Sequence, residues 1–365
     1  MIIADNYQIQ LILNNHEYDS GDILLSALAV YEGTQLSLPS VVLWGRIPEV
    51  KYKELLGDNV TGTFTIIRTY NNEEINLVKI PVKVFSLKGG SDLQEVNCQI
   101  TLSYNWSFAT KSSATVITGT SSDVFRSVGT SQGFSTTLIH SSKDSMTWIN
   151  PNKRGLIFLN EVCNHAWDSP SSCYQWAVRS DNSLIYRDLS RKNKGVLEKE
   201  IFLGLGKKNV VTDYQIESNV VALDSAYAYG RSSVTYDYKR NVLDPETGVS
   251  VISEGRMPMI SKGGPQGSFR STADYGNTHP NYARARLQNL RIKSTYNISV
   301  TMTLLSDQSD INLLDDIVVV NNNDESYSVI NKMRGIVSKR VLQYSNNKMQ
   351  VVITADTNAL NAQEL

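Results

Sequence analysis

Alternation of apolar and polar positions is the dominant pattern along the chain, and it predicts β-strands. Two early runs, 63–70 (TFTIIRTY) and 78–86 (VKIPVKVFS), are rich in β-branched residues and are bounded by polar turns. The run at 96–104 continues the pattern and places Cys98 as a half-buried strand residue. The segment 1–15 also reads as a strand. We therefore expect the first hundred or so residues to be a β domain.

The C-terminal part of the chain shows the same periodicity. Strands are predicted at 210–223, 297–304 and 335–344. The polar turn SNNK joins the last of these to another strand at 349–355, as in a hairpin. A further strand with an acidic entry is expected in INLLDDIVVVN.

Helical spacing appears in the middle of the chain. Residues 107–122 are rich in Ser and Thr and mark a boundary between modules. Beyond Ser122, a possible N-cap, apolar side chains recur at helical spacing, and a second helix is predicted at about 154–167. The runs 174–179 and 184–189 then form a hairpin that turns at SDNS. Together these elements predict a small α+β module.

One long segment has no apolar period. Residues 239–283 are dense in Gly, Pro and Ser, which indicates a functional loop or an insertion. A short helix, NYARARLQNLRIK, follows this segment. Its basic residues could contact phosphates or could form a solvated helix face; they are Arg284, Arg286, Arg291 and Lys293.

Length and charge exclude several classes of protein. A chain of 365 residues can form two or three domains with cores of their own. The formal net charge of −1 gives no bulk attraction to nucleic acid or to an anionic membrane, and no apolar run is long enough to span a bilayer. The N-terminus lacks the basic region of a signal peptide, and three cysteines do not make a disulfide framework. We therefore expect the chain to fold in a cytosol.

The stretch FLNEVCNHAWDSPSSC, 158–173, holds the rare residues that could form a metal or redox site. On a helix, Cys163 and His165 are separated by about 200° and cannot bind one ion together. A zinc site would need about four ligands, and Cys173 could join only by folding back. We expect Cys163 to be a core residue; a metal site or a reactive thiol is the alternative. The apolar stripe that favours the core is Phe158, Leu159, Val162, Cys163, Ala166 and Trp167.

The segment GTSQG, 129–133, matches the nucleophile elbow of serine hydrolases and makes Ser131 a candidate nucleophile. The elbow needs a strand before the serine and a helix after it. Here a helix precedes Ser131, and FSTTLIHSS, which reads as a strand, follows it. The other interpretation is a helix end closed by glycine. The segment GLGKKN, 204–209, lacks the first glycine of a phosphate loop.

Three segments in order resemble the baseplate hub proteins of contractile-tailed phages and the related spike proteins of type VI secretion. Leu38-Pro39, followed by Val41, Val42 and Leu43, is similar to the N-terminal tube domain of hubs. Phe158-Leu159 on a helix, before a hairpin that contains Leu184-Ile185-Tyr186, is the second match. The third is SDINLLDDIVVV, in which Asp315-Asp316 stands where hubs often have Gly-Asp.

The resemblance implies a mainly β fold with a small α+β module and two β-barrel tube domains, the second split by an insertion. We expect the first barrel at 1–106 and the α+β module at 107–205. The second barrel would comprise 206–238 and 294–365, interrupted by the insertion at 239–293. Three chains would then form a pseudo-sixfold ring, which closes by symmetry and covers exposed strand edges.

The function that the resemblance implies is structural. The chain would be a virion protein of the tail or baseplate, assembled in the bacterial host cytoplasm. It would adapt a hexameric tail tube to a trimeric spike and enclose the lumen through which DNA passes on ejection. Its partners would be its own copies, the tube or tube-initiator protein, the spike, a tape-measure protein and transiently the genomic DNA, with no membrane.

We expect no catalytic, cofactor-binding or metal-binding residues, and the partner-binding residues are not identified. The alternatives are a serine hydrolase that uses Ser131 and a carbohydrate-binding tail protein, suggested by Trp148, Trp167 and Trp176. A hub of a siphophage tail or of a phage-like contractile injection system is a further alternative.

Overall fold

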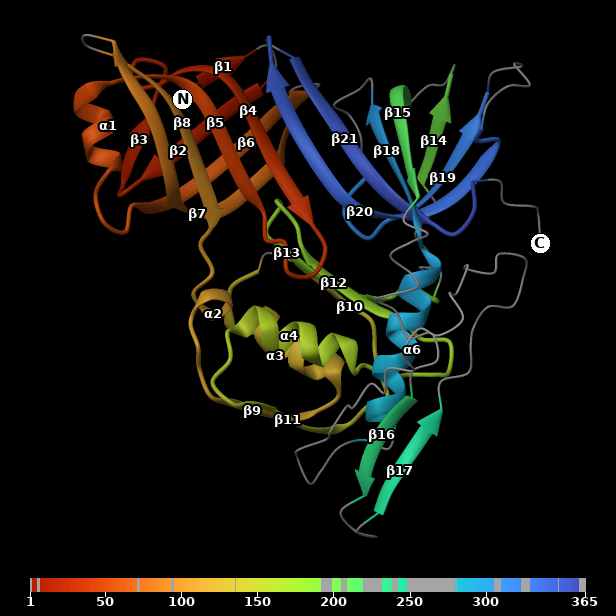
Figure 1. Cartoon of the computed structure of the whole chain (residues 1–365). Coiled ribbons are helices and arrows are strands. Elements are labelled where there is room, and N and C mark those ends of the chain that lie inside the picture. The colour runs from red at the N-terminus through yellow and green to blue at the C-terminus, as the bar shows by residue number, and fades with distance from the viewer. Residues whose placement is uncertain are drawn as a thin grey trace.

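The computed structural model shows one continuous fourteen-stranded sheet with an α+β module beneath it (Figure 1). The mainly β fold with a small α+β module, expected from the sequence, is confirmed. The described residues are 2–4, 7–70, 73–92, 95–134, 136–191, 199–204, 209–218, 232–237, 242–247, 279, 281–304, 310–322, 329–346 and 348–360.

The N-terminal β unit is a strongly curved sheet around its own core. Alternate residues of its strands point into this core: in β8, Val96, Cys98 and Ile100 are buried and their neighbours are not. Two short strands, β1 (Ile2–Ala4) and β3 (His16–Tyr18), pair along the outer edge of β2. The helix α1 (Glu49–Leu55) follows β5. In sheet order the strands are β2 (Tyr7–Leu13), β6 (Thr61–Tyr70), β7 (Glu73–Asp92), β8 (Glu95–Tyr104), β5 (Ser40–Pro48) and β4 (Leu24–Gly33).

The C-terminal β unit is a closed six-stranded barrel. The ring closes because β20 pairs with β19 along one edge and with β21, the last strand of the ring, along the other. Strict alternation of buried and half-buried residues in β18 fills the barrel with Ile298, Val300 and Met302. Around the ring the strands are β20 (Lys332–Ser345), β19 (Asp316–Asn321), β14 (Lys199–Leu203), β15 (Val210–Ser218), β18 (Ile298–Leu304) and β21 (Lys348–Thr357).

The long strand β20 joins the two β units. One of its edges pairs first with β19, through 332–336, and then with β4, through 339–345. The irregularity between Val337 and Lys339 marks the change. Leu342 lies opposite Val30 and both are buried, so the two cores lie on the same side of the shared sheet.

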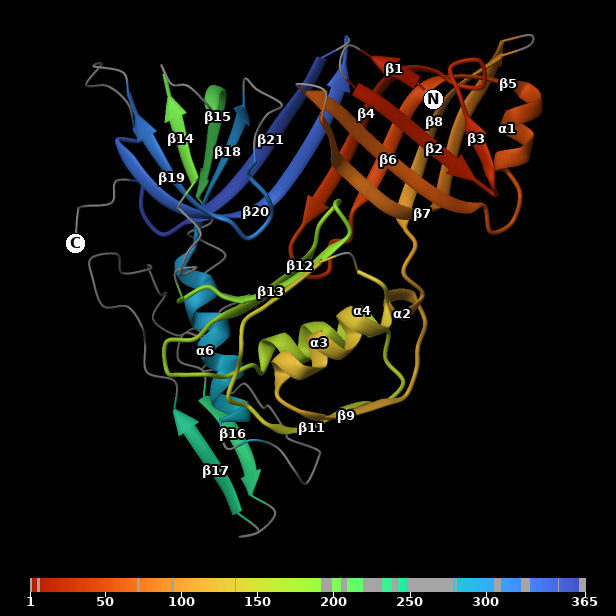
Figure 2. The same ribbon diagram turned by 180° about the vertical axis from the view of Figure 1, so that it is seen from behind.

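The α+β module lies below both β units (Figures 1 and 2). Its strands form a three-stranded sheet, in the order β10–β13–β12, and a two-stranded ribbon, β9–β11. The predicted hairpin is confirmed as β12–β13. The elements are α2 (Ser107–Thr110), β9 (Thr115–Gly119), α3 (Ser121–Ser131), β10 (Thr136–Ile139), β11 (Met146–Asn150), α4 (Gly155–Asn164), β12 (Tyr174–Val178) and β13 (Ser183–Asp188).

The start of α3 differs from the prediction. Thr120, not Ser122, is the N-cap, and it forms a capping box with Asp123. Ser121 and Ser122 are buried instead, because their polar groups find partners in the loop that follows β10.

Two predicted domain limits also differ. The strand β14, Lys199–Leu203, already belongs to the barrel, which therefore begins before residue 206. The strand β16 (Ser232–Asp237) lies within 206–238, which was predicted to belong to the second barrel. It pairs instead with β17 (Val242–Thr247) in a separate two-stranded sheet. The helix α6 (Tyr282–Thr295) packs on the module.

Some expectations lie outside the described residues. They include 219–223 and most of the segment at 239–283. None of the described helices has the length and apolar character needed to cross a membrane.

Candidate functional site

The stretch at 158–173 forms core rather than a site. All six residues of the predicted apolar stripe are buried. The Cys163 thiol donates to the Tyr174 carbonyl at 3.2 Å, and the His165 ring stacks on Tyr282, so the two side chains do not converge. Burial raises the pKa of Cys163 to about 11 and that of Cys173 to about 12, which keeps both thiols protonated and unreactive at neutral pH. Within the described part of the chain, no three His, Cys, Asp or Glu side chains could hold one metal ion.

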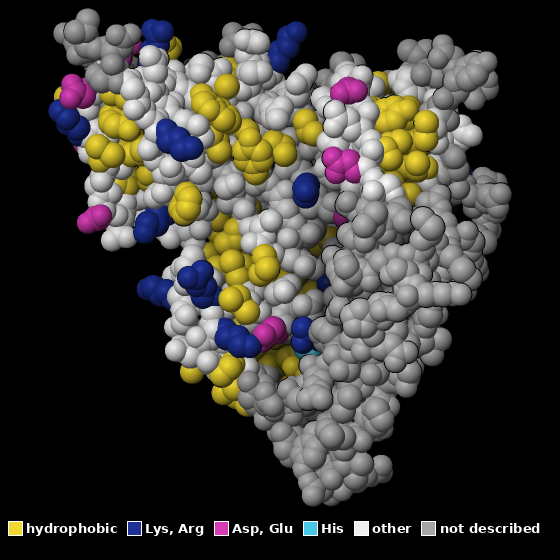
Figure 3. All heavy atoms as spheres, viewed as in Figure 1, with side chains coloured by type: hydrophobic (Ala, Val, Ile, Leu, Met, Phe, Trp, Pro, Cys, Tyr) yellow, Lys and Arg dark blue, Asp and Glu magenta, His cyan; other side chains and the backbone are white. Residues whose placement is uncertain are grey.

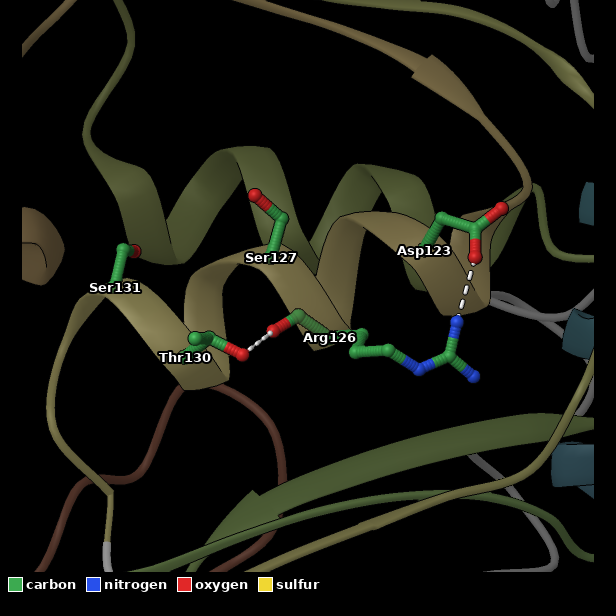
Figure 4. A pocket seen from close by; sticks show the side chains of 5 residues that line it. All are labelled: Asp123, Arg126, Ser127, Thr130 and Ser131. Atoms are coloured by element: carbon green, nitrogen blue, oxygen red, sulfur yellow. Dashed lines mark hydrogen bonds and ion pairs between the residues drawn. The ribbon is translucent and has the colours of Figure 1, made fainter.

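Ser131 is the last residue of α3 and lies at one end of a shallow surface groove (Figure 4). Its hydroxyl donates to the Val128 carbonyl at 3.2 Å. At the far end of the groove, Asp123 pairs with Arg126 at 2.6 Å. Gly133 follows with a positive φ of 71°, and β10 comes next. The backbone is a helix end closed by glycine and does not have the strand–turn–helix order of a nucleophile elbow.

We expect Ser131→Ala to leave fluorophosphonate labelling of the purified protein unchanged. The substitution should also change the free energy of unfolding by less than about 0.5 kcal/mol, because the side chain is exposed. Labelling followed by mass spectrometry of the intact protein checks this. Loss of labelling in the variant would restore the hydrolase hypothesis.

The other candidate residues are also occupied in packing. Trp148, Trp167 and Trp176 are buried and offer no exposed aromatic surface to a sugar. Lys293 is half-buried and donates to the Asn164 side chain at 3.4 Å, so the basic run is not simply a solvated face. The side chains of Arg284 and Arg291, and residues 205–208 of GLGKKN, lie outside the described set.

The structure instead brings three parts of the chain together at the β12–β13 hairpin. The Ser180 amide in its turn donates to Glu32 of β4 at 2.5 Å, and the Ser180 carbonyl accepts from the Lys79 amide of β7 at 2.7 Å. The Tyr104 hydroxyl of β8 donates to Asn182 at 2.5 Å. The Gln35 amide donates to the Trp176 carbonyl at 2.7 Å. The hairpin is therefore attached to the N-terminal β unit at four points.

A buried ion pair lies next to this hairpin, where β4 meets β20. The Arg340 guanidinium and the Glu32 carboxylate are 2.7 Å apart, and their side chains are only 5% and 2% exposed. They face each other directly in the strand register. The second carboxylate oxygen of Glu32 is the one that accepts from Ser180. One carboxylate thus ties together both β units and the module.

Two arginines of the hairpin hold the entry to β19. Arg179 donates to the Leu313 carbonyl at 3.1 Å and to Asp315 at 3.1 Å. Arg187, fully buried, donates to both oxygens of Asp316 at 3.0 and 2.9 Å. Both bonds come from the same nitrogen, Nη2, and are charge-assisted.

Asp315 and Asp316 therefore connect the start of β19 to the β12–β13 hairpin. Asp315 also accepts from the Asn312 amide at 2.8 Å and pairs with Lys199 at 2.9 Å. The residue before it, Leu314, has a positive φ of 61° and marks a sharp turn. The sequence marked the position as unusual, but nothing in it indicated which basic residues would bind there.

The face of the sheet opposite the two cores is continuous across the junction, and two of its rows cross the junction without a charged side chain, although the next row contains Lys339, and Lys83 of β7 and Asp213 of β15 lie at the two ends of the first row. One row of paired residues crosses six strands, β8, β5, β4, β20, β21 and β18, without a charged side chain. A neighbouring row crosses five strands in the same way. The first row is Ser103, Ser40, Tyr31, Val341, Val352 and Thr303; the second is Thr101, Val42, Ala29, Gln343 and Gln350. On the side seen in Figure 3, charged side chains of the β units are scattered rather than clustered.

Comparison with known proteins identifies this fold. No protein-family model matches the chain, and no curated protein matches its sequence. Among solved structures, the tail protein from Neisseria meningitidis MC58 matches with a TM-score of 0.55 at 10% identity, over 97% of this chain and 98% of that one. The 43 kDa tail protein of prophage MuSo2 from Shewanella oneidensis matches with a TM-score of 0.59 at 8% identity, over 96% and 97%.

A third structure connects the fold to secretion systems. The E. coli c3393 protein, a component of the type VI secretion system, matches with a TM-score of 0.51 at 8% identity, over 97% of this chain and 77% of that one. It is described as similar to the T4 bacteriophage tail proteins gp27 and gp5. The chain therefore has the fold of phage tail and related spike proteins, as the sequence resemblance implied.

Proposed function

We propose that this chain is the central hub of a phage tail or of a related contractile injection system. The observation that carries the proposal is the β4–β20 junction, which fuses two β units into one sheet with both cores on the same side. Each chain thus presents two similar walls side by side. Three chains would place six such units in a ring and so match a hexameric tube on one face and a trimeric spike on the other.

The continuous face described above would line the lumen of that ring. Between β8 and β18 the two rows carry hydroxyl, amide and apolar side chains, and the cations nearest to them are Lys339 in the next row and Lys83 in β7. Tight binding to the DNA backbone depends on Lys and Arg that neutralise phosphates. A wall of this composition would let DNA slide past during ejection without holding it.

The remaining surfaces would serve the partners. The module lies below both β units (Figure 1). In the proposed ring it would lie on the periphery. The ends of the two β units would contact the tube or tube-initiator protein on one side and the spike on the other, with the tape-measure protein inside until ejection. In this role the chain carries out no chemical step and acts only as a structural part of the assembled tail.

The assembly state tests the proposal. We expect the purified full chain, at tens of micromolar, to include a species of three times the 40.7 kDa chain mass by light scattering. Negative-stain images of that species should show rings with six lobes around an open centre. A strictly monomeric protein with no rings, at high concentration and with a candidate spike protein added, would refute the hub assignment.

A further inference from the structure

The helix α6 is held against the module by a buried amide. Asn289 is 1% exposed, and its side chain donates to the carbonyls of Asn164 at 2.9 Å and Ala166 at 3.3 Å. It also accepts from the Tyr174 amide at 3.0 Å. These contacts satisfy backbone groups at the end of α4 and the start of β12, which would otherwise be buried without partners. The Cys173 thiol lies beneath α6 and points to the Asn289 carbonyl at 3.8 Å.

Two histidines complete the contact. The Nδ1 atom of His165 lies 2.8 Å from the Tyr282 carbonyl, and the two rings stack with their centres 3.7 Å apart. The Nε2 atom of His279 lies 3.0 Å from the His165 carbonyl. Both histidines are almost completely buried, and Nδ1 of His279 has no hydrogen-bond partner among the described residues. Each histidine thus bridges the module and the segment that carries α6.

The surroundings oppose a positive charge on His165. Burial above all, together with Arg286 of α6 and the neighbouring His279, lowers the pKa of His165 to about 3, against the hydrogen bond to the Tyr282 carbonyl, which raises it. Burial also lowers the pKa of His279, although Asp144 acts against this shift. Asp144 already accepts four hydrogen bonds within the module. The other charged groups nearby are Glu161 of α4, which acts on Arg286, and Lys293 of α6, which contacts Asn164.

We propose that α6 is an acid-sensitive latch, in which protonation of His165 and His279 releases the helix from α4 and β12 and uncovers Cys163 and Cys173. The direction follows from proton linkage. A histidine freed by opening recovers an ordinary pKa near 6.5, so the open form binds more protons as the pH falls. The closed form then loses stability below pH 6.5, by up to about tenfold in the closing equilibrium per pH unit for each histidine. The latch is independent of the proposed hub role.

The native cysteines report the opening. The full chain is labelled with 4,4′-dithiodipyridine between pH 7.5 and pH 4.5, and the modified cysteine is identified by mass spectrometry. Rates are divided by those of the urea-unfolded chain at the same pH. Cys98 in β8 serves as the internal control, because it is buried in a different unit. We expect the relative rate at Cys173 to rise at least about 100-fold, the value for one histidine over two pH units, while Cys98 changes little.

Two variants assign the effect to the histidines. In His165→Asn/His279→Gln, the amide nitrogens take the places of Nδ1 and Nε2, which keeps both hydrogen bonds and removes both titrations. We expect its Cys173 rate to be independent of pH, and that of the single variant His279→Gln to have about half the wild-type slope. The proposal is overturned if wild-type Cys173 shows no acid rise, if it rises only together with Cys98, or if the single variant keeps the full slope. The wild-type comparison and the single variant are sufficient to test the proposal. The test therefore stays valid even if the double variant fails to fold.

Discussion

Replacing Arg340 by Met is expected to lower the free energy of unfolding by about 3–5 kcal/mol. The substitution leaves the Glu32 carboxylate buried, 2% exposed, with the Ser180 amide as its one remaining donor among the contacts described. The Met side chain fills a similar volume, so the loss is that of charge compensation and not of packing. Urea titration followed by circular dichroism measures it, and the transition that weakens should be that of the joined β units.

A matched exposed pair controls for the loss of a cation as such. Lys53 and Glu49 of α1 are 2.8 Å apart but 68% and 47% exposed. We expect Lys53→Met to cost less than about 0.5 kcal/mol, because water screens this pair. In a Glu32→Gln background, Arg340→Met should cost about 2 kcal/mol less than in the wild type, since no buried charge is left behind. Equal costs for Arg340→Met and Lys53→Met would show that the ion pair does not hold the junction.

Asp144→Asn is expected to destabilise the α+β module by about 2–5 kcal/mol. The fully buried carboxylate accepts from the Ser121 amide and the Trp167 amide, both at 2.8 Å, through different oxygens. It accepts in addition from the hydroxyls of Ser121 and Ser142. An asparagine must turn its NH₂ group toward one of the two backbone amides, whichever way it is placed. Two buried donors then face each other without an acceptor.

The neighbouring Asp123 supplies the control. Asp144 and Asp123 both accept from amides at the start of α3. Asp123 accepts from the Thr120 amide at 2.9 Å, but its side chain is 46% exposed. We expect Asp123→Asn to cost less than about 1 kcal/mol, because asparagine retains an acceptor and water can replace lost contacts. Near-ultraviolet circular dichroism reads the module through Trp148, Trp167 and Trp176. An Asp144→Asn loss no larger than that of Asp123→Asn would contradict the role given to this carboxylate.

The ion pairs that join the β units and the hairpin bear on the proposed hub role. A ring that must align with a tube and a spike needs fixed angles between its two β units and its module. Glu32 fixes the β units to each other, and Arg179 and Arg187 fix the hairpin to the entry of β19. Buried ion pairs stabilise little by comparison with apolar packing, so we infer that these pairs serve conformational specificity.

Local sequence pattern predicted the elements well where one face is buried. The alternation at 96–104 and 349–355 corresponds to β8 and β21, because a strand with one core-facing side must repeat every two residues. The stripe from Phe158 to Trp167 likewise placed Cys163 in the core. The N-cap of α3 was predicted two residues late, because Ser122 is a good capping residue whose amide and hydroxyl are engaged elsewhere.

The sequence by itself determined which segments form strands and helices, which of their sides are apolar, and, through the order of three short motifs, the resemblance to tail hubs. Tertiary structure alone decided which distant groups meet. Glu32 and Arg340 are 308 residues apart, and His165 and Tyr282 are 117 apart. Periodicity reports the direction of a side chain relative to its own element, whereas a partner depends on how elements pack. For this reason the sequence marked Asp315-Asp316 as unusual, and only the fold shows that Arg179 binds Asp315 and Arg187 binds Asp316.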